Sequence, residues 1–158
     1  MSAGRILAID YGEKNIGLAL SDEMRIIAQG LESIVNRGSK TFESIRILVE
    51  KNAVSEVVVG WPLNMNGTKS QKTLEVEKFC LELEKCIPVP VAKSDERLTS
   101  RQAERMLIDG GMSRKKRKKV NDKIAAQLIL QNYLALKKNL DRNAEEGRRT
   151  DNKDMENS

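Results

Sequence analysis

The amino-acid sequence predicts an α/β domain built on a five-stranded mixed sheet with helices against it. Two observations lead to this fold class. In the first part of the chain, three strand-like segments follow one another with short connections, which is typical of an antiparallel meander. After the meander, short apolar runs alternate with segments that have apolar residues at helical spacing, and this alternation indicates parallel strands joined through helices.

The elements can be placed in order along the chain. The meander consists of strands at 5–10, 15–22 and 25–35. The segments that follow are a helix at 39–54, a strand at 56–62, a helix at 70–86, a strand at 87–94, a helix at 99–111, a basic loop at 113–119 and an amphipathic helix at 120–139. The predicted order is therefore βββαβαβαα. The two prolines of the fifth strand favour an edge position for it.

Composition limits what the protein can be. The 158 residues suit a single domain, which we place at 1–138, followed by a charged tail at 139–158 that has no apolar periodicity and is expected to be disordered. The N-terminus has no export signal, so we expect a cytoplasmic protein. Cys80 and Cys86 are expected as reduced thiols on a helix.

The absence of histidine restricts the chemistry most. The chain has no His, which excludes His-based general base catalysis and His-ligated zinc. An enzyme built from this chain must use carboxylates, lysines and hydroxyls, and clustered carboxylates favour Mg²⁺ or Mn²⁺. The net charge also restricts the function. Residues 1–138 hold 24 basic and 17 acidic residues, and this net charge of +7 suggests a polyanionic partner.

Carboxylates follow two of the strands that should be parallel. Asp10 closes the first strand, and the fifth strand runs directly into Asp95 and Glu96. Because the carboxyl ends of parallel strands share one edge of the sheet, these acids are expected to lie close together. Asp122 begins the apolar stripe of the last helix, where it either caps that helix or joins the other acids. Three converging carboxylates would favour two-metal phosphoryl transfer.

Six consecutive basic residues end three residues before Asp122. They are Arg114, Lys115, Lys116, Arg117, Lys118 and Lys119, here called the basic run. Such a run is often no more than a solvated loop, but its position beside a predicted catalytic acid favours binding to a phosphate backbone. We therefore expect nucleic-acid contacts from these six side chains.

Other basic and aromatic residues near the acids suggest further nucleic-acid contacts. Arg97 follows Glu96 and would either stabilise charge on a phosphate or pair with Asp95, and Lys14 has the same ambiguity. Tyr11 and Trp61 directly follow strand ends and are the candidates for stacking on bases, although Trp61 would otherwise pack over the core.

Four motifs resemble those of the bacterial YqgF/RuvX family of pre-16S rRNA nucleases, also called Holliday junction resolvase-like proteins. They are "AIDYGEKNIGLALSD", "VVVGWPLNMNGTKS", "DERLTS" and "VNDKIAAQLILQNYL", in the family's order. The resemblance implies an RNase H-like fold and a hydrolase of ribosome biogenesis, a divalent-metal-dependent nuclease in which Asp10, Glu96 and Asp122 bind the metal and are catalytic. Gly12 and Gly17 match the family's glycines in the first motif, and Gly60, Pro62 and Gly67 match its loop after the fourth strand. The resemblance therefore implies that these five residues are structural loop positions.

The residues leave several alternatives open. The substrate is expected to be the 5′ end of pre-16S rRNA, and the alternatives are branched DNA, as for a Holliday junction resolvase, or binding without catalysis. An actin-like ATPase or sugar kinase also begins with a strand and Asp-x-Gly, but it needs two such domains. No membrane partner is expected, and the sequence allows a monomer or a homodimer.

Overall fold

The structure is a computed structural model that describes residues 4–97 and 114–156, with the side chains of the last helix described for residues 123–149. Its elements in chain order are β1 (Arg5–Asp10), β2 (Asn15–Ser21), β3 (Ala28–Val35), α1 (Ser39–Lys51), β4 (Val54–Trp61), α2 (Gln71–Cys86), β5 (Val91–Asp95) and α4 (Arg114–Glu156). The helix predicted at 99–111 lies outside the described residues. In the described part of the chain, no helix is long and apolar enough to cross a membrane.

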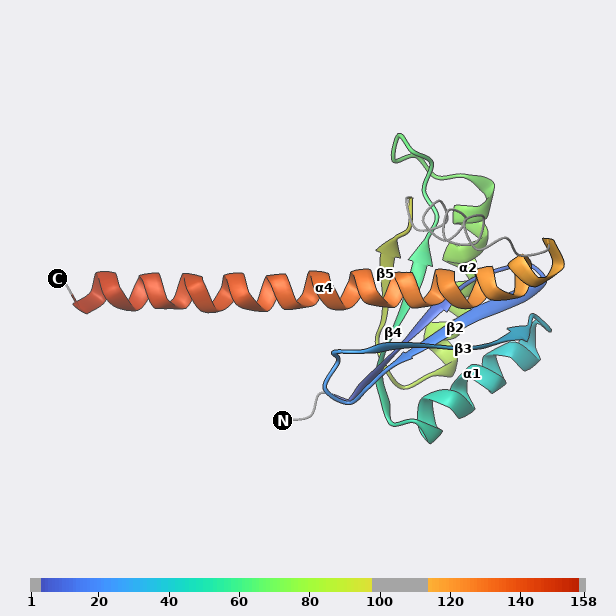
Figure 1. The fold of residues 1–158 in the computed structure, drawn as a ribbon, viewed down its shortest axis with the longest axis horizontal. Helices are drawn as coiled ribbons and strands as arrows, with labels where there is room; N and C mark the ends of the chain where they lie inside the picture. Colours follow the sequence, from blue (N-terminus) through green and yellow to red (C-terminus); the bar gives the residue numbers. More distant parts are fainter. Residues whose placement is uncertain (1–3, 98–113, 157–158) are drawn as a thin grey trace.

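The five strands form one mixed sheet in the order β3-β2-β1-β4-β5 (Figure 1). β1, β2 and β3 are antiparallel neighbours, which confirms the predicted meander. β4 is parallel to both β1 and β5, which confirms the predicted crossovers through helices. β5 is the outermost strand on its side, as its prolines predicted.

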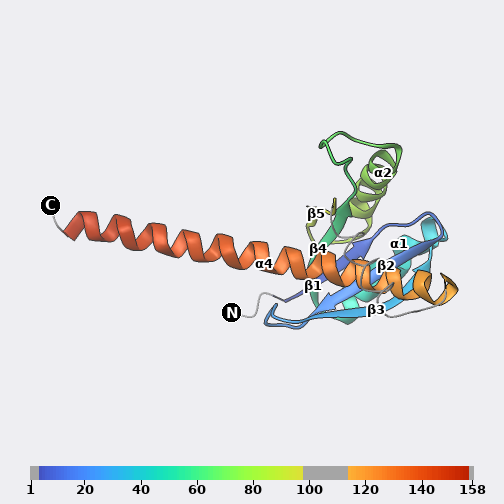
Figure 2. The same cartoon turned by 45° about the horizontal axis from the view of Figure 1, so that its top comes forward.

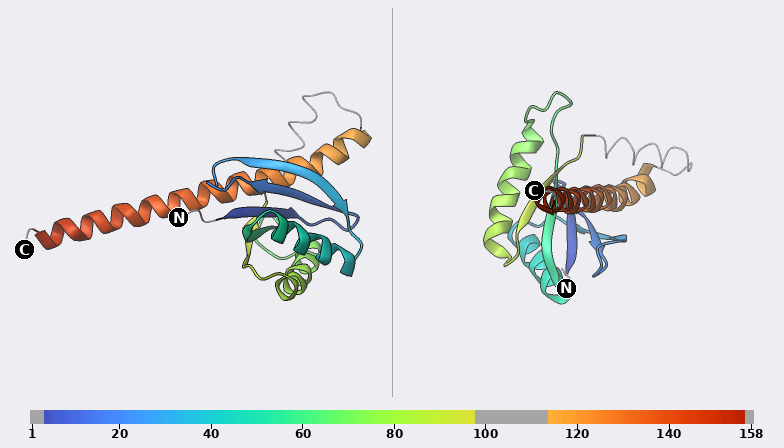
Figure 3. Two further views of the ribbon diagram at one scale, coloured as in Figure 1. Left: turned by 90° about the horizontal axis from the view of Figure 1, so that it is seen from below. Right: turned by 90° about the vertical axis from the view of Figure 1, so that its left-hand side faces the viewer.

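The sheet lies between two helical layers, with α1 and α2 on one face and α4 on the other (Figure 3). Alternating residues of the central strands supply the two halves of the core. Leu7, Ile9 and Val59 are fully buried in the cluster that contains α1 and α2 side chains. Ala8 and Val58 are fully buried against α4. This alternation follows from the two-residue period of a strand, and it fixes which side chains at the strand ends face α4.

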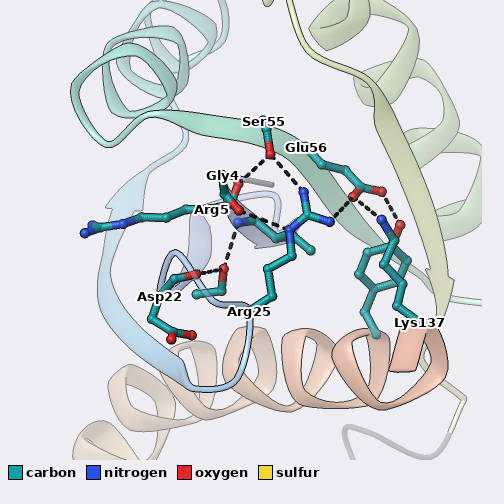
Figure 4. A network of polar contacts seen from close by, with 10 residues as sticks. Gly4, Arg5, Asp22, Arg25, Ser55, Glu56 and Lys137 are labelled. Carbon is teal, nitrogen blue, oxygen red and sulfur yellow. Dashed lines mark hydrogen bonds and ion pairs between the residues drawn. The ribbon is translucent and has the colours of Figure 1, made fainter. Parts of the chain in front are cut away.

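An ionic network ties α4 to the amino end of β4 (Figure 4). The Glu56 carboxylate accepts hydrogen bonds from Tyr133 and Lys137 of α4. Arg25, which lies between β2 and β3, forms a 3.7 Å ion pair with Glu56 and donates at 2.9 Å to Ser55 Oγ. Burial alone would raise the pKa of Glu56, but the hydrogen bonds from Lys137 and Tyr133 hold it below its ordinary value. The network thus sets where α4 crosses the sheet.

Helix α4 begins earlier than the sequence predicted. A loop was expected at the basic run, and this part of the prediction is wrong. The backbone is helical at all six of its positions, which are Arg114, Lys115, Lys116, Arg117, Lys118 and Lys119. Lys and Arg are intrinsically good helix formers, so the run can continue the helix towards its N-terminus.

Helix α4 also ends later than predicted. Residues 139–158 were expected to be disordered, yet the helix continues to Glu156 and extends well beyond the sheet (Figure 2). Residues 138–149 are exposed throughout. The absence of apolar periodicity therefore indicated that this part of the chain does not pack against the sheet. The helix is maintained there by residues with high helix propensity, such as Leu, Arg, Ala and Glu.

Candidate active site

The side chains of Asp10 and Glu96 meet at the carboxyl ends of β1 and β5. Asp10 is the last residue of β1 and continues the alternation of Ala8, so it lies on the α4 face of the sheet. Glu96 follows β5 directly, and its backbone N–H donates at 3.2 Å to the carbonyl of Trp61 at the end of β4. A hydrogen bond joins the Glu96 and Asp10 carboxyl groups. The parallel strands thus bring together two acids that are far apart in sequence.

Gly60 makes room for the Glu96 carboxyl group. It lies within β4, between β1 and β5 in the sheet. A Cβ atom at this position would lie 2.6 Å from Glu96 Oε2 and 2.6 Å from Ile129 Cδ1 of α4. Both distances are shorter than the contacts that side-chain carbons make, so only glycine lets the carboxyl group lie between the sheet and α4.

The acid pair holds a proton near neutral pH. Glu96 is buried, with 7% of its surface exposed. Burial, followed by the charge of Asp10, raises the pKa of Glu96 to about 8. Two carboxylates cannot hydrogen-bond each other without a proton, so the hydrogen bond between Glu96 and Asp10 requires one proton held by the pair. A pair of repelling oxygen donors, one of them buried, is also a composition that a divalent cation stabilises.

The structure describes the third predicted acid, Asp122, only at its backbone. Asp122 lies on α4, seven residues before Ile129, but its side chain is outside the described residues. Among the side chains that the structure describes, no three Asp, Glu, Cys or His residues gather closely enough to hold a metal ion. The role of Asp122 therefore stays a prediction.

Arg97 is engaged in an ion pair. Its guanidinium group binds Asp95 at 2.6 and 2.8 Å, and it also donates at 3.3 Å to the carbonyl of Met65. The hydrogen bond from Arg97 lowers the pKa of Asp95. Of the two roles left open for Arg97, the structure shows the pairing with Asp95, which also ties β5 to the loop after β4.

The two candidate stacking residues both contact the core on the side of α1 and α2. The Tyr11 ring packs on Phe79 of α2, with 4.8 Å between ring centroids. Trp61 is half-buried against the same cluster. Each therefore uses part of its ring for packing, and only the remaining surface is open to a base.

The remaining basic candidates lie in the turn after β1 and at the start of α4. Lys14 is exposed in the turn after β1. The others belong to the basic run, whose backbone forms the start of α4 but whose side chains are outside the described residues: Arg114, Lys115, Lys116, Arg117, Lys118 and Lys119. Their contact with a phosphate backbone therefore stays a prediction, and a helix rather than a loop would present them.

The predicted structural positions divide between loops and strands. Gly12 lies in the turn after Asp10, where a Cβ would stand 2.2 Å from the carbonyl oxygen of Asn15. Pro62 and Gly67 lie in the loop after β4, and Gly67 has a φ of 85° that favours glycine. Gly17 is not in a loop but in β2, opposite Asp10. Gly60 is likewise a strand residue.

Sequence reasoning gave no role to Lys72, although its charge acts on the acid pair. Lys72 lies in the first turn of α2, which Ser70 and Thr73 cap reciprocally. The Thr73 hydroxyl donates to the Pro62 carbonyl, which places this turn at the end of β4. The ammonium group lowers the pKa of Glu96, against the larger effects of burial and Asp10. A serine directly before the helix is a sequence signal that could have located this turn.

A family model described as RuvX, Holliday junction resolvase, matches residues 4–136. The chain belongs to the RuvX family. The match includes Asp10, Glu96 and Asp122 and ends shortly before α4 leaves the sheet. The RNase H-like fold that the resemblance implied is the fold of this chain.

Individual relatives cover the same region. A protein of Geobacillus thermodenitrificans named "Putative pre-16S rRNA nuclease" is 47% identical over 137 residues, which cover 85% of this chain and 99% of that protein. A protein of the same name from Dictyoglomus thermophilum is 46% identical over 131 residues, covering 82% and 94%. Among solved structures, T. thermophilus RuvC in complex with a Holliday junction substrate covers 80% of this chain and 91% of that one, with 15% identity and a TM-score of 0.47.

Proposed function

We propose that this RuvX-family chain is a divalent-metal-dependent nuclease that hydrolyses phosphodiester bonds in pre-16S rRNA, in the cytoplasm. The observation that carries the proposal is the contact between the half-buried Asp10 and the buried Glu96 at the carboxyl edge of the sheet. A structural role explains this contact poorly, because burying a carboxyl group beside a second one destabilises the fold.

The donor set fits a hard cation. The pair offers carboxylate oxygens, and the chain has no imidazole, which suits Mg²⁺ or Mn²⁺. Asp10 and Glu96 would hold the metal, and we propose Asp122 as the third ligand. When bound, divalent ions activate a water molecule and stabilise the leaving oxygen in phosphodiester hydrolysis.

The protein groups have roles of their own in this proposal. Glu96 must lose its proton to act as a ligand, and the nearby Lys72 ammonium favours that ionised form. Gly60 keeps the Glu96 carboxyl group between the sheet and α4. The basic run, with Lys14, is proposed to bind the substrate backbone, because clustered Lys and Arg displace counterions from phosphates.

The RNA substrate is proposed from the curated relatives, which carry the name of a pre-16S rRNA nuclease over nearly their whole length. A second candidate is branched DNA, which the description of the matching family favours. Both substrates are hydrolysed by the same chemistry, so only a direct comparison separates them.

A cleavage panel tests the proposal. A pre-16S rRNA fragment, an unrelated single-stranded RNA and a four-way DNA junction are each incubated with the protein and Mg²⁺ or Mn²⁺. We expect cleavage of the rRNA precursor that EDTA abolishes. Cleavage of the junction alone would instead assign the resolvase activity.

Amide substitutions test the residues. Asp10→Asn, Glu96→Gln and Asp122→Asn should each abolish cleavage, and their effects should not add, because the three groups act as one unit. Asp141→Asn, an exposed carboxylate on the same helix as Asp122, is the control and should retain full activity. Wild-type rates in the Asp10→Asn/Asp122→Asn double variant, or undiminished cleavage in EDTA, would contradict the mechanism.

A further inference from the structure

Two lysines lie over the ring of Trp61. Lys93 Nζ of β5 is 4.4 Å from the ring centroid, and Lys69 Nζ of the loop after β4 is 5.9 Å from it. The ring faces the α1 and α2 side of the sheet, opposite to the acid pair. Cation–π contacts hold ammonium groups and an aromatic face together, so the two kinds of group form one surface.

The positive charge of this region is little neutralised. Lys69 forms an ion pair with Glu77 at 3.4 Å. Lys93 and Lys72 are exposed, and no carboxylate of the described residues lies within ion-pair distance of either one. Together these lysines leave an excess of positive charge around one half-buried aromatic ring.

The surface is continuous with the proposed active site. Trp61 pairs with Asp95 in the parallel ladder, one residue before Glu96. Lys93 lies two residues before Asp95 on β5, which is the outermost strand on its side of the sheet among the described residues. Lys72 extends the positive charge towards the acid pair, because its charge acts on Glu96.

We propose that Trp61, Lys69, Lys72 and Lys93, here called the Trp61 surface, bind the phosphate backbone of a nucleic-acid strand on the α1 and α2 side of the sheet, beside the carboxyl end of β5 that carries the acid pair. The inference rests on the proposed nuclease function. Lysines spaced along a strand end meet phosphates, and the open part of the Trp61 ring stacks on one base of any identity.

A simpler role does not account for the whole surface. A lysine on an edge strand prevents pairing with other sheets, which would explain Lys93 alone. It does not explain Lys69 and Lys72, which come from a loop and a helix. An acidic protein segment would also suit the charge, but the surface is continuous with acids proposed to cut phosphodiesters, which favours nucleic acid as the occupant.

Binding measurements on a neutralised surface test the proposal. In the Asp10→Asn background, Lys69, Lys72 and Lys93 are each replaced by Gln, and binding of labelled single-stranded RNA is followed by fluorescence anisotropy across a salt series. The matched control replaces three other exposed lysines, Lys40, Lys51 and Lys85, and has the same net charge.

The expected loss of affinity is at least about tenfold in the surface variant. The slope of log K against log salt should fall by up to about 2, at roughly 0.7 for each phosphate contact with a single strand. The control should differ from the parent less than about twofold. Trp61 is the only tryptophan, so its emission should change on RNA addition in the parent and change less in the surface variant.

The outcomes separate this inference from the proposed function. Unchanged affinity and salt slope in a folded surface variant overturn the Trp61 surface, even when the wild-type chain cleaves RNA. Weakened binding in the surface variant supports it, even when the wild-type chain cleaves nothing. Polyglutamate that binds the parent more tightly than RNA does, and loses that binding in the surface variant, overturns the choice of nucleic acid.

Discussion

Glu96→Gln should stabilise the metal-free protein at alkaline pH. The pKa of Glu96 is about 8 in the folded protein, compared with an ordinary value of 4.5. Between these values the folded state holds one proton more than the unfolded state, so the free energy of unfolding falls as pH rises. Below about pH 4.5 the Glu96 carboxyl group is protonated in both the folded and the unfolded state, and above about pH 8 it is ionised in both.

The size of the effect follows from the two values. Each pH unit between the unfolded and folded pKa values of Glu96 lowers the free energy of unfolding by about 1.4 kcal/mol. The whole interval therefore corresponds to at most about 5 kcal/mol of lost stability at high pH. Gln keeps the shape of the neutral acid and cannot ionise, so the variant escapes this loss. Its advantage over the wild type should be small near pH 4.5 and grow until about pH 8.

Urea denaturation in EDTA at a series of pH values measures this difference. Glu84→Gln, an exposed position on α2, is the control and should follow the wild type at every pH. Mg²⁺ should restore stability to the wild type at alkaline pH, because a ligand that binds only the folded state stabilises it, and should not do so in Glu96→Gln. A constant difference between wild type and Glu96→Gln from acid to alkaline pH would refute the reasoning.

Three other changes have defined outcomes. Gly60→Ala should lower the free energy of unfolding by about 1–3 kcal/mol in urea denaturation and reduce cleavage, because the new methyl group displaces the acid pair, whereas Gly147→Ala, in open space, should do neither. Alanine at the four lysines of the basic run should weaken RNA binding regardless of sequence and flatten its salt dependence, and an unchanged slope would contradict a backbone contact by Lys115, Lys116, Lys118 and Lys119. Removal of 139–158 should change the free energy of unfolding by less than about 0.5 kcal/mol, measured by the same method.

Most of the fold followed from local sequence patterns. The limits of β1 at Arg5 and Asp10 coincide with the prediction, because the strand is apolar and ends at a turn. The parallel placement of β4 and β5 required only that helices join them. That placement in turn predicted that Asp10 and Glu96 lie at one edge, and the structure brings their side chains together.

Other features depend on contacts that no local pattern encodes. The role of Gly60 depends on Glu96 and on Ile129 of α4, which are distant in sequence. The contact of Lys93 with Trp61 depends on the register between β4 and β5. The helical course of 139–156 was missed because apolar periodicity indicates burial, and residues 138–149 are exposed. The basic run was expected as a loop because it contains no apolar residue.

The exposed end of α4 also affects how the size of this protein is measured. At about 1.5 Å for each residue, the 43-residue helix is roughly 65 Å long. A compact chain of 158 residues has a radius of gyration of about 15 Å. A monomer with this arm therefore diffuses slowly and elutes early from a gel-filtration column, where it resembles a compact dimer. Light scattering, which reports mass independently of shape, is needed to decide between monomer and dimer.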